Sequence, residues 1–173
     1  ILASDLSETT FVDNSIVELG RYRYAIEAYN IDGKGGVTTS GYIVNGPARS
    51  LPLFANFDVK DATEPNLWTI GDANGDGISF FWNYDNNIRK GAFFYQTYNV
   101  SDANDWLISP PTRFEANMPY KIVVSAAPAS SSQPEKFTIH LIQNYDLSTA
   151  IAVSEEFVVD HRGEYRAEID SIP

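Results

Sequence analysis

Apolar side chains recur at every second residue in short segments bounded by turn residues, and this pattern constrains the fold more than any other feature. One such segment runs from Gly20 to Tyr29, and every second residue in it is apolar or aromatic: Tyr22, Tyr24, Ile26 and Ala28. A period of two is that of a β-strand, whose successive side chains point to opposite faces. We find no segment of helical period that is long enough to form a helix of ordinary length. The sequence therefore predicts an all-β protein.

The same reading predicts a hairpin near the N-terminus and a series of strands after it. Residues 30–36, Asn-Ile-Asp-Gly-Lys-Gly-Gly, have the composition of a turn, and a returning strand is expected over 37–44. Short strands bounded by Pro, Ser, Asn or Gly favour an antiparallel sandwich over a parallel α/β sheet. Further strands are expected over 91–98, 120–126, 137–142, 152–159 and 165–169.

Charge and cysteine usage exclude several classes of function. The formal net charge is −11, which repels nucleic acid and anionic lipid surfaces. The chain contains no cysteine, so disulfides, thiolate metal sites and cysteine nucleophiles are all excluded. No stretch is apolar for long enough to span a bilayer, so we expect no membrane insertion. Because the chain opens on Ile1 inside a patterned region, we expect it to be a piece of a longer protein.

The run Gly-x-Tyr-x-Tyr-x-Ile-x-Ala, from Gly20 to Ala28, resembles the penultimate strand of a fibronectin type III module. The resemblance implies that Tyr22 occupies the tyrosine-corner position, where its hydroxyl donates a hydrogen bond to backbone a few residues upstream. It covers residues 1–45 and implies that the first half of the module lies outside this chain. Asn45-Gly46-Pro47 then has the turn composition of a linker.

Residues 46–173 resemble the cleaved-adhesin family, also called choice-of-anchor J, of Bacteroidetes surface proteins. That resemblance implies a jelly roll, a two-sheet antiparallel sandwich, on a secreted or cell-surface protein. Family members end with further strands and an acidic segment, so this domain is either truncated at its C-terminus or divergent there. The matching features are Phe57, Trp68, Asp72 to Gly77, Trp82, Asp105-Trp106-Leu107-Ile108-Ser109-Pro110, Tyr120-Lys121 and Pro134-Glu135-Lys136.

Asp72-x-Asn74-x-Asp76-Gly77 is the strongest candidate for metal chemistry. Alternate oxygen-bearing residues on a tight loop can converge on one cation, as in the opening of an EF-hand loop. Asn83 stands where an EF-hand needs its bidentate glutamate, so the loop is not an EF-hand. Two interpretations stay open. Structural calcium, which the family resemblance also implies, binds Asp72, Asn74 and Asp76 with help from a distant group, or the loop is an Asx-rich turn.

Aromatic residues gather around that loop, and Trp82 and Tyr84 are the candidates for ligand binding. Exposed rings beside polar loops stack on sugars, which predicts a carbohydrate site. The competing interpretation is that Trp68 and Trp82 pin the loop onto the sandwich, because large rings dominate core burial. The sequence favours the second interpretation.

The sequence contains neither of two common catalytic motifs. His140 and His161 are the only histidines, and neither a Gly-x-Ser-x-Gly elbow nor a His-Glu-x-x-His motif occurs. The sequence therefore predicts a protein that is not an enzyme.

These observations together predict a non-catalytic adhesion, binding and spacer module of a multidomain bacterial protein that is secreted or displayed on the cell surface. Its expected partners are a host protein, a glycan or neighbouring domains of the same polypeptide. The alternatives are an accessory region of a secreted protease or glycosidase, and a carbohydrate-binding module. Accessory and adhesive modules share one sequence pattern, so the sequence does not separate them.

Overall fold

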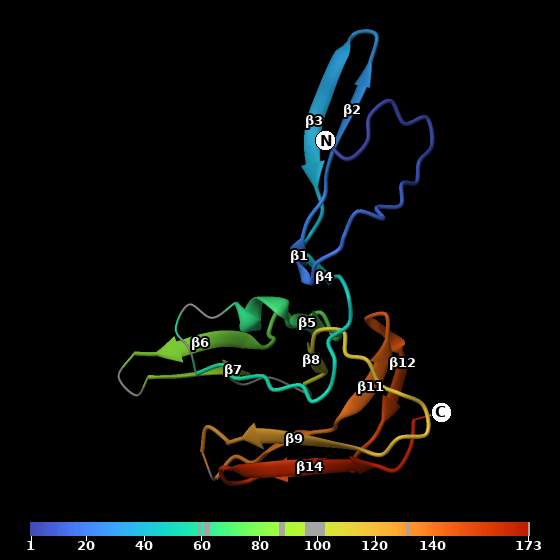
Figure 1. Cartoon of the computed structure of the whole chain (residues 1–173). Coiled ribbons are helices and arrows are strands. Elements are labelled where there is room, and N and C mark those ends of the chain that lie inside the picture. The colour runs from blue at the N-terminus through green and yellow to red at the C-terminus, as the bar shows by residue number, and fades with distance from the viewer. Residues whose placement is uncertain (59, 61–62, 87–88, 96–102, 131, 173) are drawn as a thin grey trace. The chain divides into compact units, whose positions relative to one another are not determined.

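A computed structural model describes residues 1–58, 60, 63–86, 89–95, 103–130 and 132–172 (Figure 1). Every strand pair within these ranges is antiparallel, which confirms the prediction of an all-β fold. The helix among the described residues is a short 3-10 turn, η1 (Glu64–Leu67), and it lacks the length needed to cross a membrane. The strands are β1 (Gly20–Tyr22), β2 (Ala25–Asn30), β3 (Gly33–Thr39), β4 (Ile43–Asn45), β5 (Thr69–Asp72), β6 (Phe81–Asp85), β7 (Lys90–Phe94), β8 (Asp105–Ile108), β9 (Tyr120–Ala126), β10 (Glu135–Phe137), β11 (His140–Gln143), β12 (Asp146–Ala152), β13 (Phe157–Val159) and β14 (Gly163–Ile169).

The chain divides into two compact units, Ile1–Thr112 and Arg113–Pro173. In the first unit β1 pairs with β4, β2 with β3, β5 with β8 and β6 with β7. In the second unit β9 pairs with β14, β10 with β13 and β11 with β12. The division lies far from the boundary at residues 45 and 46 that the family resemblances imply, and that boundary stays a prediction.

The predicted N-terminal hairpin forms, but each of its strands is interrupted. The segment 20–29 separates into β1 and β2 at Arg23-Tyr24, and the returning segment separates into β3 and β4. Ser40 bridges the interruption, since its hydroxyl accepts a hydrogen bond from the Tyr24 N–H at 2.9 Å and its own N–H donates to the Tyr24 carbonyl at 2.8 Å. The turn is also shorter than predicted, because the Asn30 side chain accepts from the Gly33 N–H and β3 starts at Gly33.

The start of β1 is fixed by a tyrosine hydroxyl and two glycines. The Tyr22 hydroxyl donates to the Glu18 carbonyl at 2.6 Å, which confirms the hydrogen bond predicted for the tyrosine-corner position. A Cβ at Gly20 would lie 3.2 Å from atoms of the Tyr22 ring. Gly46 follows β4 with a φ of +132°, and its backbone lies against Glu18 and Leu19. The upstream segment is thereby held against both strands of the β1–β4 pair.

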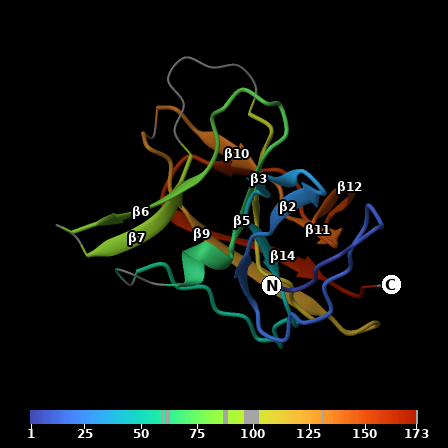
Figure 2. The ribbon, with the colours of Figure 1, turned by 90° about the horizontal axis from the view of Figure 1, so that it is seen from above.

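An aromatic cluster links the end of η1 to the β6–β7 hairpin. Figure 2 shows the ribbon of this hairpin from above. The ring centroid of Phe57 lies 5.3 Å from that of Trp68 and 5.0 Å from that of Phe93, both edge to face. Glu64 accepts hydrogen bonds from Trp68 Nε1 at 3.2 Å and from Arg49 at 2.8 Å. Edge-to-face rings contribute beyond the area they bury. The segment before η1 is therefore tied to β7 by rings and to η1 by an ion pair.

The β9–β14 pair has the regular alternation that the sequence predicts. Val124 is opposite Tyr165 and Ile122 is opposite Ala167, and these half-buried or buried residues share one face. Tyr165 also packs on Phe137 and Phe157, with ring centroids 5.5 and 5.6 Å away. On the opposite face Lys121 lies 3.6 Å from Glu168. One face of this sheet therefore contributes to the core of the second unit and the other faces solvent.

Gly46→Ala tests how closely the upstream segment approaches β4. The added Cβ would lie 2.4 Å from the Glu18 carbonyl oxygen, and alanine tolerates the positive φ poorly, so we expect a loss of more than about 1 kcal/mol of unfolding free energy. Urea denaturation measures this loss. Gly36→Ala is the matched control, because nothing lies within 4 Å of its added Cβ. Equal stability of the two variants would contradict the described approach.

Candidate functional site

The loop that follows β5 holds the three predicted metal ligands, and its carboxylates accept backbone hydrogen bonds. Asp72 accepts from the Gly75 N–H at 2.7 Å with one oxygen and from the Gly77 N–H at 2.9 Å with the other. Asp76 accepts from the Ile78 N–H at 2.8 Å. Gly75 and Gly77 have φ of +71° and +80°, which glycine adopts without steric cost. The loop therefore has the geometry of an Asx-rich turn.

The structure brings Asp72, Asn74 and Asp76 together on one exposed loop. The Asn74 amide nitrogen donates to Asp76 at 3.1 Å, so the two side chains are adjacent. Within the part of the chain that the structure describes, no group of three Asp, Glu or His side chains is arranged to hold a metal ion. Each carboxylate oxygen has a second lone pair beyond the one that accepts an N–H, so the turn and a bound cation are compatible. Calcium at this loop stays a prediction.

Asp105 is a second acidic residue at the base of the loop, and the sequence reading assigned it no role. It is the first residue of β8 and is paired directly with Asp72 across the β5–β8 ladder. Both of its carboxylate oxygens are buried and have no hydrogen-bond partner among the residues that the structure describes. Cross-strand partners point to the same face of a sheet, so the two carboxylates share a face. A buried carboxylate without a partner is costly, and a nearby cation would remove that cost.

Trp82 and Tyr84, the predicted ligand-binding residues, lie on one face of β6 with their ring centroids 6.4 Å apart. Trp82 is paired with Phe93 of the aromatic cluster, and the Trp82 indole nitrogen is buried with no hydrogen-bond partner within the described ranges. Both residues are half-buried. Their role in binding stays a prediction.

The exposed rings of this hairpin lie on the opposite face, and the sequence did not single them out as candidates for ligand binding. Phe81 and Phe94 are directly paired, each is 43% exposed, and their rings stack with centroids 5.8 Å apart. Strand alternation offered the signal, because Phe81 must point away from the side to which Trp82 points.

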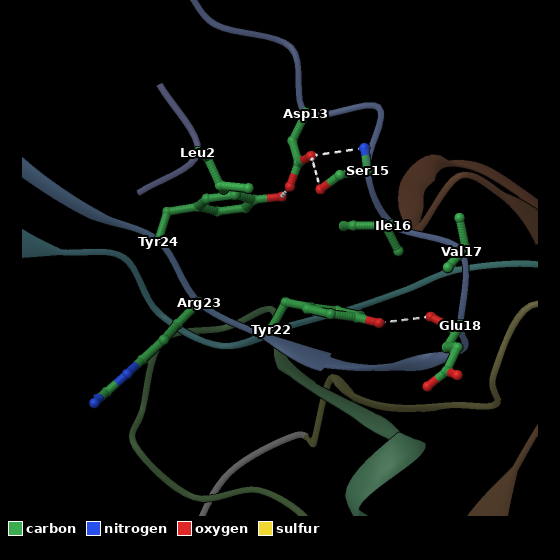
Figure 3. A pocket seen from close by; sticks show the side chains of 9 residues that line it. All are labelled: Leu2, Asp13, Ser15, Ile16, Val17, Glu18, Tyr22, Arg23 and Tyr24. Atoms are coloured by element: carbon green, nitrogen blue, oxygen red, sulfur yellow. Dashed lines mark hydrogen bonds between the residues drawn. The ribbon is translucent and has the colours of Figure 1, made fainter. Parts of the chain in front are cut away.

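An open hollow of about 280 Å³ lies beside the tyrosine corner (Figure 3). Asp13 organises it by accepting hydrogen bonds from the Ser15 hydroxyl at 2.6 Å, the Ser15 N–H at 2.8 Å and the Tyr24 hydroxyl at 2.9 Å. The Ser15 hydrogen bonds and then that of Tyr24 lower the pKa of Asp13, because they stabilise the charged form. The same bond to Asp13 raises the pKa of Tyr24.

The two histidines lie in different settings. His161 is exposed, and its Nδ1 lies 2.5 Å from a carboxylate oxygen of the neighbouring Asp160. His140 is half-buried at the start of β11. The hydrogen bond from His161 lowers the pKa of Asp160.

The Asp13 carboxylate predicts a pH dependence of stability. Its pKa is depressed in the folded state, so its contribution is present above the unfolded value of about 3.9 and is lost as pH falls through the folded value. The unfolding free energy of Asp13→Asn, measured between about pH 2 and pH 6, should therefore fall less on acidification than that of the original chain. Tyr24→Phe should raise the Asp13 pKa measured by NMR titration, and Asp170→Asn is the control. An Asp13 pKa at or above about 3.9 would contradict the described hydrogen bonds.

Comparison of the chain with protein-family models, with curated proteins and with solved structures found no match. The resemblances to a fibronectin type III module and to the cleaved-adhesin family therefore rest on the residues of this chain.

Proposed function

We propose that this chain is a non-catalytic binding and architectural module of a multidomain bacterial protein that is secreted or displayed on the cell surface. Residues 1–45 would form the end of a fibronectin-like spacer, and residues 46–173 a jelly-roll sandwich that presents loops to a partner. The packed sheets would fix the geometry of the loops, and the loops would supply the contacts. Its partners would be a host protein, a glycan or neighbouring domains.

The spacer assignment is supported by the local geometry around Tyr22. Its hydroxyl reaches the Glu18 carbonyl, and Gly20 leaves room for the ring. Both features are expected of the tyrosine corner in a fibronectin-like module.

The observation that carries the proposal for the second part is the pairing of Asp105 with Asp72 at the base of the loop. The buried Asp105 carboxylate lies beside the exposed Asp72 side chain at the end of a two-stranded ladder, and a structural cation would stabilise a carboxylate in that position. Asp72, Asn74, Asp76 and Asp105 would hold calcium, which prefers oxygen ligands of this kind. The ion would neutralise the carboxylates and order the loop without performing chemistry.

Calcium should therefore raise the melting temperature of the chain, and EDTA should reverse the rise. At about 100 times the dissociation constant a ligand adds about 2.7 kcal/mol of stability, so a shift of several degrees is expected. Asp76→Ala should remove the calcium-dependent shift. Asp170→Ala, which alters an exposed carboxylate in the other unit, is the control and should keep it. Differential scanning calorimetry measures the melting temperature of the original chain and of both variants, each in calcium and in EDTA.

The variant Asp105→Asn tests whether Asp105 is a metal ligand or a carboxylate with a purely structural role. In EDTA the variant should be at least as stable as the original chain, because the amide removes an unpartnered buried charge. In calcium it should lose most of the thermal shift. A variant that is destabilised in EDTA and still responds fully to calcium would refute the role proposed for Asp105.

Two alternatives come from the same observations. The chain would equally serve as an accessory region of a secreted protease or glycosidase, because such regions also use rigid β scaffolds. A carbohydrate-binding module built on Trp82 and Tyr84 is less well supported, because the Trp82 indole nitrogen is buried.

A further inference from the structure

Two arginines lie against one tyrosine ring at the β1–β4 pair. The guanidinium carbon of Arg21 lies 4.2 Å from the centroid of the Tyr42 ring, and that of Arg23 lies 5.3 Å from it. Arg21 lies in β1 and Arg23 follows it directly, so both side chains reach the same ring from neighbouring stretches of backbone. Figure 3 shows Arg23 pointing away from Tyr22 and Tyr24. The three side chains form a cluster of their own, which we call the Arg21–Tyr42–Arg23 cluster.

The cluster carries positive charge that the described part of the chain does not neutralise. The sequence has 23 acidic residues against 12 lysines and arginines, so carboxylate partners are abundant. None of the ion pairs among the described residues uses Arg21 or Arg23. The basic residues that do form ion pairs with carboxylates are Lys34, Arg49, Lys90, Lys121, Lys136 and Arg166.

Each of the two guanidinium groups lies within cation–π distance of the Tyr42 ring. The negative face of the ring attracts each cation and restricts its motion. Both arginines are exposed, and Tyr42 is 54% exposed. Their N–H donors are therefore preorganised and face solvent, where they can bind an anion with less loss of side-chain entropy than two mobile arginines.

The chemistry of the cluster selects a carboxylate on a compact ligand. Guanidinium presents a planar pair of donors that matches the two oxygens of a carboxylate. A polyanion such as a sulfated polymer would be repelled by the net charge of −11, whereas a ligand with a single negative charge meets little long-range repulsion. The exposed part of the Tyr42 ring adds an aromatic surface on which the C–H groups of a sugar ring can pack.

We propose that the Arg21–Tyr42–Arg23 cluster binds a saccharide that carries a carboxylate. The inference rests on the proposed binding function and gives it a ligand class. It places the site in residues 1–45, which the family resemblance assigns to a spacer, and it uses none of the residues of the Asp72 loop.

Titration of the full chain with 3′-sialyllactose and with lactose tests the proposal, using isothermal calorimetry and NMR chemical shifts in the same buffer. The acidic sugar should bind at least tenfold more tightly than lactose. Arg21→Ala with Arg23→Ala should weaken binding of the acidic sugar at least tenfold. Replacing both arginines with lysine should restore only part of the affinity, because lysine keeps the charge but lacks the planar fork. Arg166→Ala, which alters an exposed arginine paired with Glu164, is the matched control and should bind as the original chain does.

Circular dichroism of each variant shows whether weaker binding comes from removal of the site or from unfolding of the chain. If the alanine variant unfolds, the lysine variant still tests the proposal. Equal affinity for lactose and 3′-sialyllactose, or unchanged binding after removal of both arginines, would overturn the proposal. Tighter binding of an acidic pentapeptide than of the acidic sugar would also overturn it, in favour of a protein partner.

The titration is repeated in EDTA, so that its outcome is independent of the calcium experiment. Binding of the acidic sugar without any calcium-dependent thermal shift supports the cluster and refutes the calcium-ordered loop. A thermal shift without binding of the acidic sugar refutes the cluster alone.

Discussion

The hydrogen bond from the Tyr22 hydroxyl to the Glu18 carbonyl is the interaction on which the arrangement around the β1–β4 pair depends. It links the segment before β1 to the first strand, and Gly46 lets the backbone after β4 pack on the same segment. A single hydrogen bond contributes only about 1 kcal/mol, but this one joins the segment before β1 to a strand that is itself paired with β4. The geometry of the Arg21–Tyr42–Arg23 cluster follows from it, because both arginines flank Tyr22.

The same device recurs in the second unit. The Tyr165 hydroxyl donates to the His161 carbonyl at 3.0 Å, near the start of β14. At the start of β9 the Tyr120 hydroxyl accepts from the Glu115 N–H at 2.6 Å. In each case an aromatic ring buries part of its surface while its hydroxyl satisfies backbone just upstream of the strand. Tyrosine thus provides both packing and a local backbone partner, which suits a chain without disulfides.

Acidic side chains organise the loops by accepting backbone hydrogen bonds. Asp13 accepts from the Ser15 N–H, Asp72 from Gly75 and Gly77, and Asp146 from the Ser148 N–H at 2.9 Å. The Ser148 hydrogen bonds lower the pKa of Asp146, as those of Ser15 lower that of Asp13. These three carboxylates therefore have a structural role in their loops. Asp105 differs, because its buried oxygens accept no hydrogen bond from the described part of the chain.

Alternation along the chain was sufficient to predict the all-β class and the β9 strand, whereas the hydroxyl bond of Tyr22 was implied by the resemblance to a fibronectin type III module. It did not predict the break at Arg23-Tyr24, because that break depends on Ser40, a residue far along the chain that replaces a ladder bond. The sequence identified the Asp72 loop but not Asp105, because cross-strand register brings these residues together and register is not readable from one strand alone. Part of the strand predicted over 91–98 lies outside the described residues, which give β7 as Lys90–Phe94.

Native-state hydrogen exchange in the original chain and in Tyr22→Phe tests the central claim most directly. Loss of the hydroxyl should speed exchange of the β1 and β4 amides about fivefold, which corresponds to about 1 kcal/mol, and should leave the β9 and β14 amides unchanged. Unchanged exchange in β1 and β4, or equal acceleration in both units, would contradict the account.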